Sequence, residues 1–268
     1  MRASMRTMTS TLLLLLTLAA SAATSAAPDT TVILRRPVSH AMCYYVALPN
    51  GWTAQRDWPV LVVIPDASRD FAGNLRAFMQ VRGDRPYILV APEVLSCGGA
   101  RSRSLDHYTY SAAEWDSLQS GDDFTFEGAG FAAVLADVHR QWRGDSRAYL
   151  TGWEAGGHTV WAEAFRHPER WRGVAPVTPN YQRRGLTPAT WSHASARAAL
   201  VIQPLRCGAP KGEDAALLLK SVDSQTATAL ADAREHGFKP RAVHVVPGAD
   251  HGPLPDAVLA WCDSLRKR

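Results

Sequence analysis

One pentapeptide carries most of the chemical information in this sequence: Gly152-Trp153-Glu154-Ala155-Gly156. Two glycines four residues apart around a central reactive side chain form the frame of a nucleophile elbow, where a strand ends in a sharp turn and a helix begins at once. A serine at the centre would attack a carbonyl carbon. The central residue here is Glu154, whose side chain is longer and normally ionised at neutral pH. A serine-esterase mechanism therefore cannot run through residue 154.

The segments on either side of this pentapeptide have the order that an elbow requires. The bare glycine spacing arises by chance about once in a chain of this length, because glycine makes up about 7% of residues. Ala148 to Thr151, however, has the pattern of a short buried strand, and Ala155 to Phe165 that of a helix. A second candidate follows near the end of the chain, where His251 lies in the stretch Val246 to Gly252, after the last predicted strand.

Strands and helices alternate along the rest of the chain, which predicts a mainly parallel sheet covered by helices on both faces. The predicted strands are 31–34, 42–48, 60–64, 87–90, 148–151, 174–177, 200–202 and 243–246, and the predicted helices are 71–81, 131–142, 155–165, 226–235 and 255–265. The stretch from Ser96 to Asp122 is polar, aromatic and irregular, so we expect an extended loop over the cleft. Right-handed crossovers would bring the carboxyl ends of the strands, and the cleft, to one edge of the sheet.

The first 27 residues predict export. Arg2 and Arg6 precede an apolar run from Leu12 to Ala20, and small residues follow, as in a secretory signal peptide. The apolar run is short for a membrane span. We therefore expect a secreted or periplasmic protein with a signal peptide over 1–27, a single domain over 28–268, and no stable membrane insertion after cleavage.

Four cysteines, Cys43, Cys97, Cys207 and Cys262, lie in the exported part. An even number in an oxidising compartment predicts two disulfides, with three possible pairings that the sequence does not distinguish. Cys207 as a nucleophile is the alternative. The spacing matches neither a CxxC pair nor a zinc site, so we expect no metal and no organic cofactor. The formal net charge is +4, and the arginines are scattered among acids, which argues against nucleic-acid binding.

The sequence resembles the α/β-hydrolases, most closely secreted esterases of the feruloyl esterase and poly(3-hydroxybutyrate) depolymerase type. The segment Leu150 to Tyr181, LTGWEAGGHTVWAEAFRHPERWRGVAPVTPNY, is similar to the elbow, helix and next strand of those enzymes. The stretch VPGADHG around His251 resembles the loop that carries their catalytic histidine. The resemblance spans most of residues 28–268 and implies an α/β-hydrolase fold with a cleft for a small-molecule or polymer ester-like ligand.

The chain departs from that pattern at the other catalytic positions as well. The loop after the strand 60–64 contains Asp66 and Ala67 where relatives have a His-Gly-rich oxyanion segment. Asp66, Ala67 and Ala155 are the candidates for the oxyanion hole, although the Asp66 carboxylate would bring negative charge to a site meant to stabilise it. The expected loop for the triad acid contains no carboxylate in frame. Glu213 and Asp214 would reach His251 only if that loop folded back.

Two principal hypotheses follow. In the first, the protein has lost serine-dependent acyl transfer and binds a ligand in the former cleft, while Glu154 and His251 form a charge-assisted pair. In the second, Glu154 is itself a carboxylate nucleophile and His251 activates the water that hydrolyses the resulting ester.

Two further hypotheses stay open at this point. One moves the nucleophile to Ser68, Ser96 or Ser111. The other is a non-catalytic protein that binds a polysaccharide on an aromatic loop made by Tyr108, Tyr110, Trp115, Phe124 and Phe126.

Overall fold

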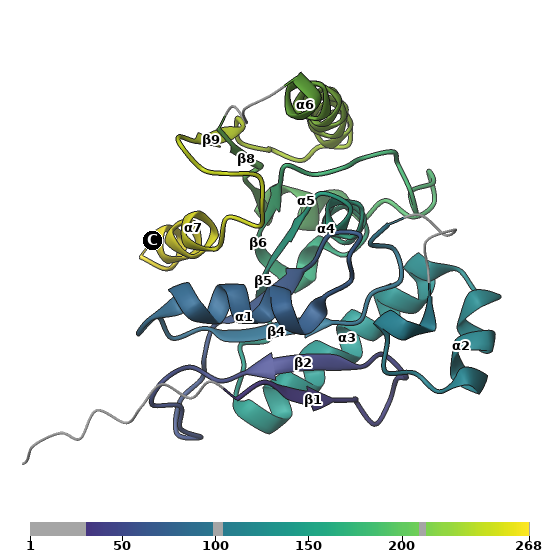
Figure 1. Cartoon of the computed structure of the whole chain (residues 1–268), viewed down its shortest axis with the longest axis vertical. Coiled ribbons are helices and arrows are strands. Elements are labelled where there is room, and N and C mark those ends of the chain that lie inside the picture. Colours follow the sequence, from purple (N-terminus) through teal and green to yellow (C-terminus); the bar gives the residue numbers. More distant parts are fainter. Residues whose placement is uncertain (1–30, 99–103, 209–212, 268) are drawn as a thin grey trace, which may run out of the picture.

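A computed structural model of the chain describes residues 31–98, 104–208 and 213–267 (Figure 1). The predicted signal peptide therefore lies outside the described residues. The helices are α1 (Phe71–Arg82), α2 (Ala112–Gln119), α3 (Asp123–Trp142), α4 (Gly156–Arg166), α5 (Ala194–Ala199), α6 (Glu213–Glu235) and α7 (Pro255–Arg266), with 3-10 turns η2 (Leu105–His107) and η3 (Pro168–Arg170). The strands are β1 (Ile33–Arg35), β2 (Tyr44–Ala47), β3 (Val60–Ile64), β4 (Ile88–Pro92), β5 (Ala148–Trp153), β6 (Trp171–Val177), β7 (Val201–Ile202), β8 (Leu205–Cys207) and β9 (His244–Val246).

The strands form one sheet in the order β1-β2-β4-β3-β5-β6-β8-β9, and β7 pairs beside β6. The β1–β2 and β2–β4 pairs are antiparallel, whereas every pair from β4 to β9 is parallel. The central strands β3 and β4 are buried along their whole length, as continuous apolar runs in a covered parallel sheet should be. The prediction of a mainly parallel sheet is confirmed, and the architecture is that of the α/β-hydrolase fold.

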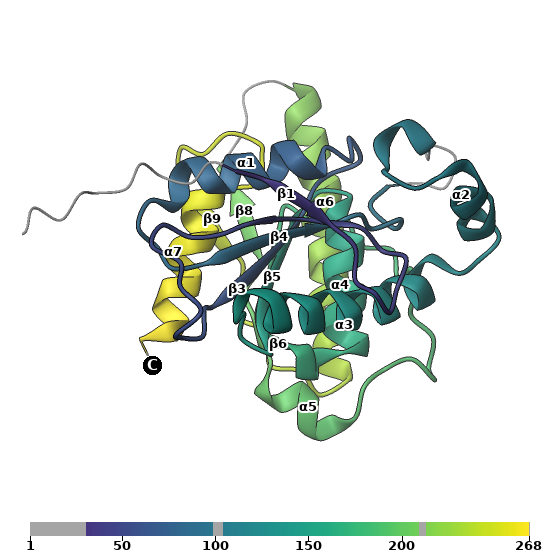
Figure 2. The ribbon, with the colours of Figure 1, turned by 90° about the horizontal axis from the view of Figure 1, so that it is seen from below.

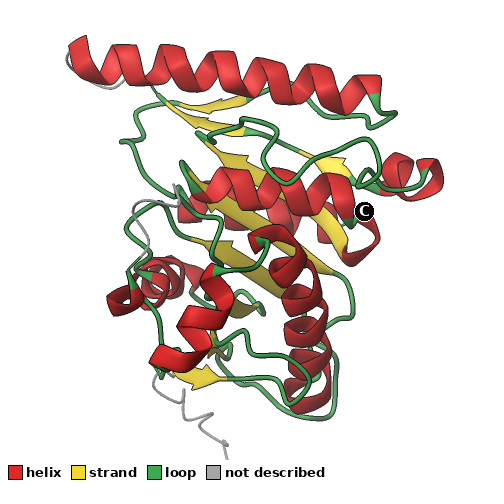
Figure 3. Ribbon diagram, turned by 90° about the vertical axis from the view of Figure 1, so that its right-hand side faces the viewer, coloured by secondary structure: helices red, strands yellow, loops and turns green. Residues whose placement is uncertain are grey.

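Helices cover the two faces of the sheet. The helices α1 and α7 contact each other on one face, α3 and α4 contact each other, and the sheet runs between α1 and α3 (Figure 2). Aromatic rings join the layers: Tyr149 on β5 meets Trp261 on α7 at 6.1 Å between ring centroids, and Phe131 on α3 meets Trp171 on β6 at 5.6 Å. The long helix α6 lies at the end of the sheet that β8 and β9 form (Figures 1 and 3).

Several elements differ from the sequence prediction: α3 begins at Asp123 and not at Phe131, α5 was not predicted, and three further differences bear on the site. Helix α6 begins at Glu213, thirteen residues before the predicted start at Thr226, because residues 213–225 have helix-forming side chains without the periodic apolar pattern that the prediction used. The strand β8 was not predicted: it has only three residues, and it forms because β6 and β9 pair with it on either side. The predicted loop from Ser96 to Asp122 contains α2, which Ser111 and Glu114 start with a capping box.

The aromatic loop is also placed differently from the prediction. Tyr108, Tyr110, Trp115 and Phe124 are buried, and the rings of Tyr108 and Trp115 lie 4.8 Å apart. These side chains pack on the core, because leaving their large apolar surfaces in water would cost free energy. The exposed aromatic face that a polysaccharide would need is not formed by these residues.

The four cysteines are free and buried, so the predicted disulfides are not formed in this structure. Each thiol lies in a different environment. Cys43 contacts Arg36, Cys97 follows β4, Cys207 ends β8 and Cys262 lies on α7. The even count predicted pairing, but none of the four thiols is bonded to another.

Candidate functional site

The elbow predicted from the sequence is present at the carboxyl end of β5. The strand ends at Trp153, and α4 begins at Gly156, so Glu154 and Ala155 alone make the turn. Glu154 has φ +46°, a left-handed conformation that is uncommon for a residue with a side chain. Its backbone is held on both sides, since Glu154 N–H donates to the carbonyl of Val177 at 3.2 Å and Asn180 N–H donates to the carbonyl of Glu154 at 2.8 Å. The strained turn presents the Glu154 side chain at the edge of the sheet.

Both glycines of the elbow are required by close packing. A Cβ atom on Gly152 would lie 2.8 Å from the side chain of Val160 and 3.0 Å from the carbonyl oxygen of Gly156. A Cβ atom on Gly156 would lie 2.3 Å from the carbonyl oxygen of Pro65, closer than atoms can approach. The turn after β5 and the turn after β3 are therefore in direct backbone contact. This contact places the turn that contains Asp66 and Ala67 beside the turn that contains Ala155, so the oxyanion-hole candidates lie in neighbouring segments.

His251 reaches the elbow from the loop between β9 and α7. Its Nε2 lies 2.5 Å from Oε1 of Glu154, and both side chains are about a quarter exposed, at 26% for His251 and 24% for Glu154. The indole of Trp153 lies edge-on to the imidazole, with ring centroids 5.4 Å apart. The two residues predicted to form a charge-assisted pair are thus in hydrogen-bond contact, although they are 97 positions apart in sequence.

The neighbours of the imidazole indicate which of its two nitrogens carries a hydrogen. We assign to Nε2 of His251 the hydrogen in this bond, because an ionised carboxylate only accepts hydrogen bonds. In a serine triad this nitrogen takes the proton of the nucleophile. With a hydrogen directed at Glu154, Nε2 has no lone pair available for that role.

The other imidazole nitrogen faces a thiol. Nδ1 of His251 lies 3.8 Å from Sγ of Cys207, the last residue of β8. Thr178 completes the group from the end of β6, because its Oγ1 donates to Sγ of Cys207 at 3.7 Å and accepts from the Cys207 N–H at 3.4 Å. Thr178 is fully buried and has φ +41°, which is strained for a β-branched residue. A line of side chains, Glu154–His251–Cys207–Thr178, thus connects the ends of four strands.

Sequence analysis did not assign Cys207 to this position. The loop after β7 contains no carboxylate in frame, and the even number of cysteines indicated a disulfide for Cys207. The available indication was the order along the chain, since Cys207 lies between the elbow and His251, at the place where the triad acid of an α/β-hydrolase belongs. Helix α6 begins at Glu213, but the side chains of Glu213 and Asp214 lie outside the described residues.

The oxyanion candidates lie in the turn after β3 and at the start of α4. The Asp66 carboxylate is bound within its own turn: Oδ1 accepts from the backbone N–H of Ser68 at 3.2 Å and from its hydroxyl at 2.6 Å. Ala67 is exposed, and its carbonyl accepts from Nη1 of Arg69 at 3.2 Å. Ala155 is buried and precedes the first residue of α4. The two hydrogen bonds from Ser68 partly stabilise the negative charge that Asp66 brings to the carboxyl end of β3.

The three alternative serines have structural roles. The Ser68 hydroxyl is bound to Asp66, Ser96 is fully buried and donates to Glu127 at 2.7 Å, and Ser111 caps α2. His158 lies in the first turn of α4, and burial lowers its pKa to about 4. Each of the three hydroxyls is bound to a carboxylate in a local structural contact, and none of them contacts a histidine among the described residues.

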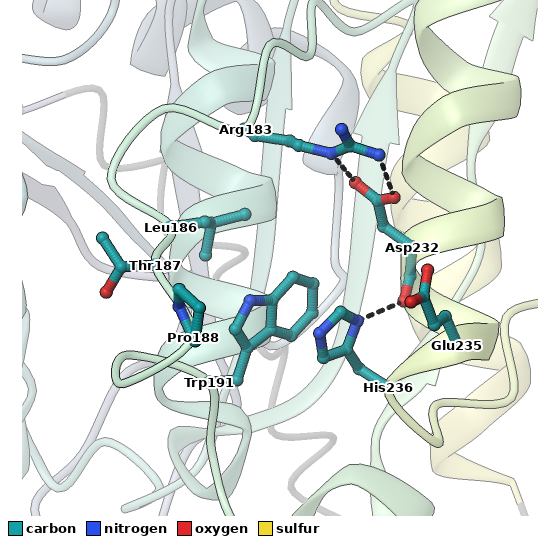
Figure 4. A pocket seen from close by; sticks show the side chains of 8 residues that line it. All are labelled: Arg183, Leu186, Thr187, Pro188, Trp191, Asp232, Glu235 and His236. Atoms are coloured by element: carbon teal, nitrogen blue, oxygen red, sulfur yellow. Dashed lines mark hydrogen bonds and ion pairs between the residues drawn. The ribbon is translucent and has the colours of Figure 1, made fainter.

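A separate pocket of about 340 Å³ lies between the segment after β6 and the carboxyl-terminal half of α6 (Figure 4). Nε and Nη2 of Arg183 each lie 2.7 Å from an oxygen of Asp232, and Tyr181 donates to the same carboxylate at 2.6 Å. The ring of Trp191 is stacked on His236 with centroids 3.5 Å apart. These contacts hold the segment that follows β6 against α6.

Within the described residues, no group of three or more His, Cys, Asp or Glu side chains is placed to hold a metal ion. None of the described helices is long and apolar enough to cross a membrane.

Comparison with known proteins supports the fold. No protein-family model and no curated sequence matches the chain. Among solved structures, the chain is similar to poly(aspartic acid) hydrolase-1 from a Sphingomonas species, with 15% identity, 89% of this chain and 98% of that one covered, and a TM-score of 0.58. An S-formylglutathione hydrolase from Agrobacterium tumefaciens gives 13% identity, 90% and 96% coverage, and a TM-score of 0.54.

A larger protein, described as a dipeptidyl aminopeptidase IV from Bacteroides ovatus, gives 14% identity and a TM-score of 0.57. The match covers 90% of this chain but only 35% of that one. At these identities the likeness shows the fold alone. The chain has the α/β-hydrolase fold, and its structural neighbours include esterases and other hydrolases.

Proposed function

We propose that this protein is a divergent, exported member of the esterase-like α/β-hydrolases, whose cleft binds a small-molecule or polymer ester-like ligand and does not hydrolyse it through residue 154. The observation that carries the proposal is the 2.5 Å contact between Oε1 of Glu154 and Nε2 of His251. It occupies the nitrogen on which a serine nucleophile depends, and it places a carboxylate where an oxyanion would form. The predicted signal peptide over residues 1–27 supports secretion or a periplasmic location.

The alternative, in which Glu154 is the nucleophile, has weaker geometric support. A carboxylate nucleophile must point a free oxygen at the substrate, and a separate histidine must then activate water for hydrolysis of the ester. One oxygen of Glu154, Oε1, is bound to His251, so the imidazole that would have to activate water is directed at the carboxylate itself. The other imidazole nitrogen faces Cys207, not a carboxylate that would stabilise an imidazolium.

The test is to rebuild the missing triad at the positions that the structure indicates. Glu154→Ser restores a hydroxyl at the elbow, and Cys207→Asp places a carboxylate at the end of β8, facing Nδ1 of His251. We compare hydrolysis of p-nitrophenyl acetate and butyrate by wild type, Glu154→Ser, and the double variant Glu154→Ser/Cys207→Asp. The double variant Glu154→Ala/Cys207→Asp is the matched control, since it has the acid but no hydroxyl.

The proposal expects no hydrolysis through residue 154 in wild type. It expects Glu154→Ser/Cys207→Asp to exceed its alanine control by at least about tenfold, well within the range of general-base catalysis. Binding is measured separately by calorimetry with N-(4-nitrophenyl)acetamide, an amide analogue that resists hydrolysis. Wild-type hydrolysis that disappears in Glu154→Ala but persists in Cys207→Ser would show that residue 154 is the nucleophile. Absence of analogue binding together with an inert rebuilt triad would show that the cleft is not assembled.

A further inference from the structure

The site contains the three group types of a nucleophilic triad, with two of them in exchanged places. In an α/β-hydrolase the nucleophile follows the elbow strand and the acid follows a later strand. Here the acid, Glu154, occupies the elbow, and a thiol, Cys207, ends β8. His251 lies between them, with Nε2 at 2.5 Å from the carboxylate and Nδ1 at 3.8 Å from the sulfur.

This arrangement fulfils the geometric conditions of a thiol–imidazole–carboxylate triad. Such a triad needs an imidazole with one nitrogen toward the thiol and the other toward a carboxylate or amide that fixes its tautomer. A triad is defined by these contacts and not by the order of the residues along the chain. Because Nε2 carries the hydrogen bound by Glu154, the lone pair of a neutral His251 lies on Nδ1, toward Cys207. Glu154 would then be a positioning residue for His251.

We propose that Cys207 is an acyl acceptor that His251 activates, and that it takes small acyl groups from an ester held in the cleft. The inference rests on the proposed function, because the ester must first bind beside the elbow. Cys207 is fully buried, whereas His251 and Glu154 are each about a quarter exposed, so a ligand reaches the sulfur only past the imidazole. Acetyl, a small acyl group, is therefore the one to test.

The step balances without an oxidant or a metal. The Cys207 thiol gives its proton to Nδ1 of His251, and the Glu154 carboxylate stabilises the resulting imidazolium through Nε2. The thiolate attacks the ester carbonyl, a carbon–sulfur bond forms, and the carbon–oxygen bond of the ester breaks. The leaving alcohol takes the proton back from His251. The products are an acyl-thioester on Cys207 and the free alcohol, and water attacking that thioester would release the acid.

The other three thiols of the chain provide internal controls. Cys97 and Cys262 are buried and free, as Cys207 is. Burial raises the pKa of Cys97 to about 12 and holds the pKa of Cys262 well above its usual value. Cys43 contacts the guanidinium of Arg36, with Nε at 3.2 Å from Sγ. Among the described cysteines only Cys207 contacts an imidazole. The comparison with Cys97 and Cys262 therefore tests the effect of His251 on thiols that are equally buried.

The experiment treats the folded wild-type chain with p-nitrophenyl acetate, quenches it in acid to preserve thioesters, and maps acetylated cysteines by peptide mass spectrometry. The proposal expects acetylation of Cys207 at least about tenfold faster than of Cys97 and Cys262, a difference within the effect of one positioned base. His251→Ala should remove the difference, and Glu154→Gln should reduce it. Cys207→Ser, which nearly keeps the size of the side chain, should abolish thioester formation and leave the melting temperature close to that of wild type.

The result that overturns the inference is acetylation of Cys207 no faster than of Cys97 and Cys262 in folded wild type. Preferential acetylation of Cys207 that survives unchanged in His251→Ala would also overturn it, because simple access would then explain the reaction. If the amide analogue binds and Cys207 stays unmodified, the inference fails while the proposed function stands. If neither occurs, both fail.

Discussion

The close contact between the turn after β5 and the turn after β3 predicts the effect of a single methyl group. In Gly156→Ala the new Cβ would meet the carbonyl oxygen of Pro65 at 2.3 Å, with the side chain of Ile64 at 3.0 Å and its carbonyl oxygen at 3.1 Å. The nearest of these lies roughly 1 Å inside ordinary contact distance. Two of the three atoms belong to the backbone, so a rotamer change cannot relieve the contact.

The expected cost combines two opposing effects. Overpacking of this kind costs about 1–3 kcal/mol of unfolding free energy. Alanine in place of glycine returns up to about 1 kcal/mol in a helix interior, and less here, because Gly156 is the first residue of α4. The net loss should be about 2 kcal/mol, which lowers the melting temperature of a domain of this size by about 4–8 °C.

The assay is thermal unfolding followed by circular dichroism at 222 nm. The matched control is Gly121→Ala, whose Cβ would meet only the carbonyl oxygen of Leu118 at an ordinary 3.6 Å. The control should stay within about 0.5 kcal/mol of wild type. A Gly156→Ala variant that melts within 1 °C of the control would show that the two turns are not in contact, and the elbow geometry would then be wrong.

Two further predictions concern titratable groups. Glu127 is buried on α3, and burial raises its pKa to about 7, so the folded protein keeps a proton that the unfolded chain releases above about pH 4.5. The free energy of unfolding should therefore fall by about 3 kcal/mol as the pH rises from 4.5 to 7. In Glu127→Gln, urea unfolding should show a smaller dependence of this free energy on pH. An unchanged pH dependence would contradict the assignment. For Asp232, the hydrogen bond from Arg183 lowers the pKa, so its contribution to stability is present above about pH 4 and is lost as the pH falls through the folded-state pKa. Asp232→Asn should melt below wild type at pH 7, with the difference closing below pH 4; a difference that persists in acid would rule out the Arg183 pair as its cause.

The part of the site made by local sequence was predictable. The glycines at 152 and 156, with an apolar strand before them and a helix after them, define the elbow, because a strand-to-helix turn this tight leaves no room for a side chain at either position. The place of His251 after the last strand followed from the alternation of strands and helices. The contact of Glu154 with His251 followed in turn, because parallel strands present their carboxyl ends at one edge.

The rest of the site depends on pairing between distant segments. Leu205 to Cys207 is too short and too ordinary to identify as a strand, and it becomes β8 only because β6 and β9 provide hydrogen-bond partners on both sides. That pairing brings the Cys207 thiol to Nδ1 of His251, whereas the count of four cysteines indicated disulfides.

The sequence by itself determined the α/β-hydrolase architecture and the absence of a serine at residue 154, because both are written in local patterns of apolar residues and glycines. The tertiary structure decided which groups face His251. The two nitrogens of one imidazole are set by neighbours 97 and 44 positions away, Glu154 and Cys207. A contact over such a separation depends on the register of the whole sheet, and no short stretch of sequence contains that register.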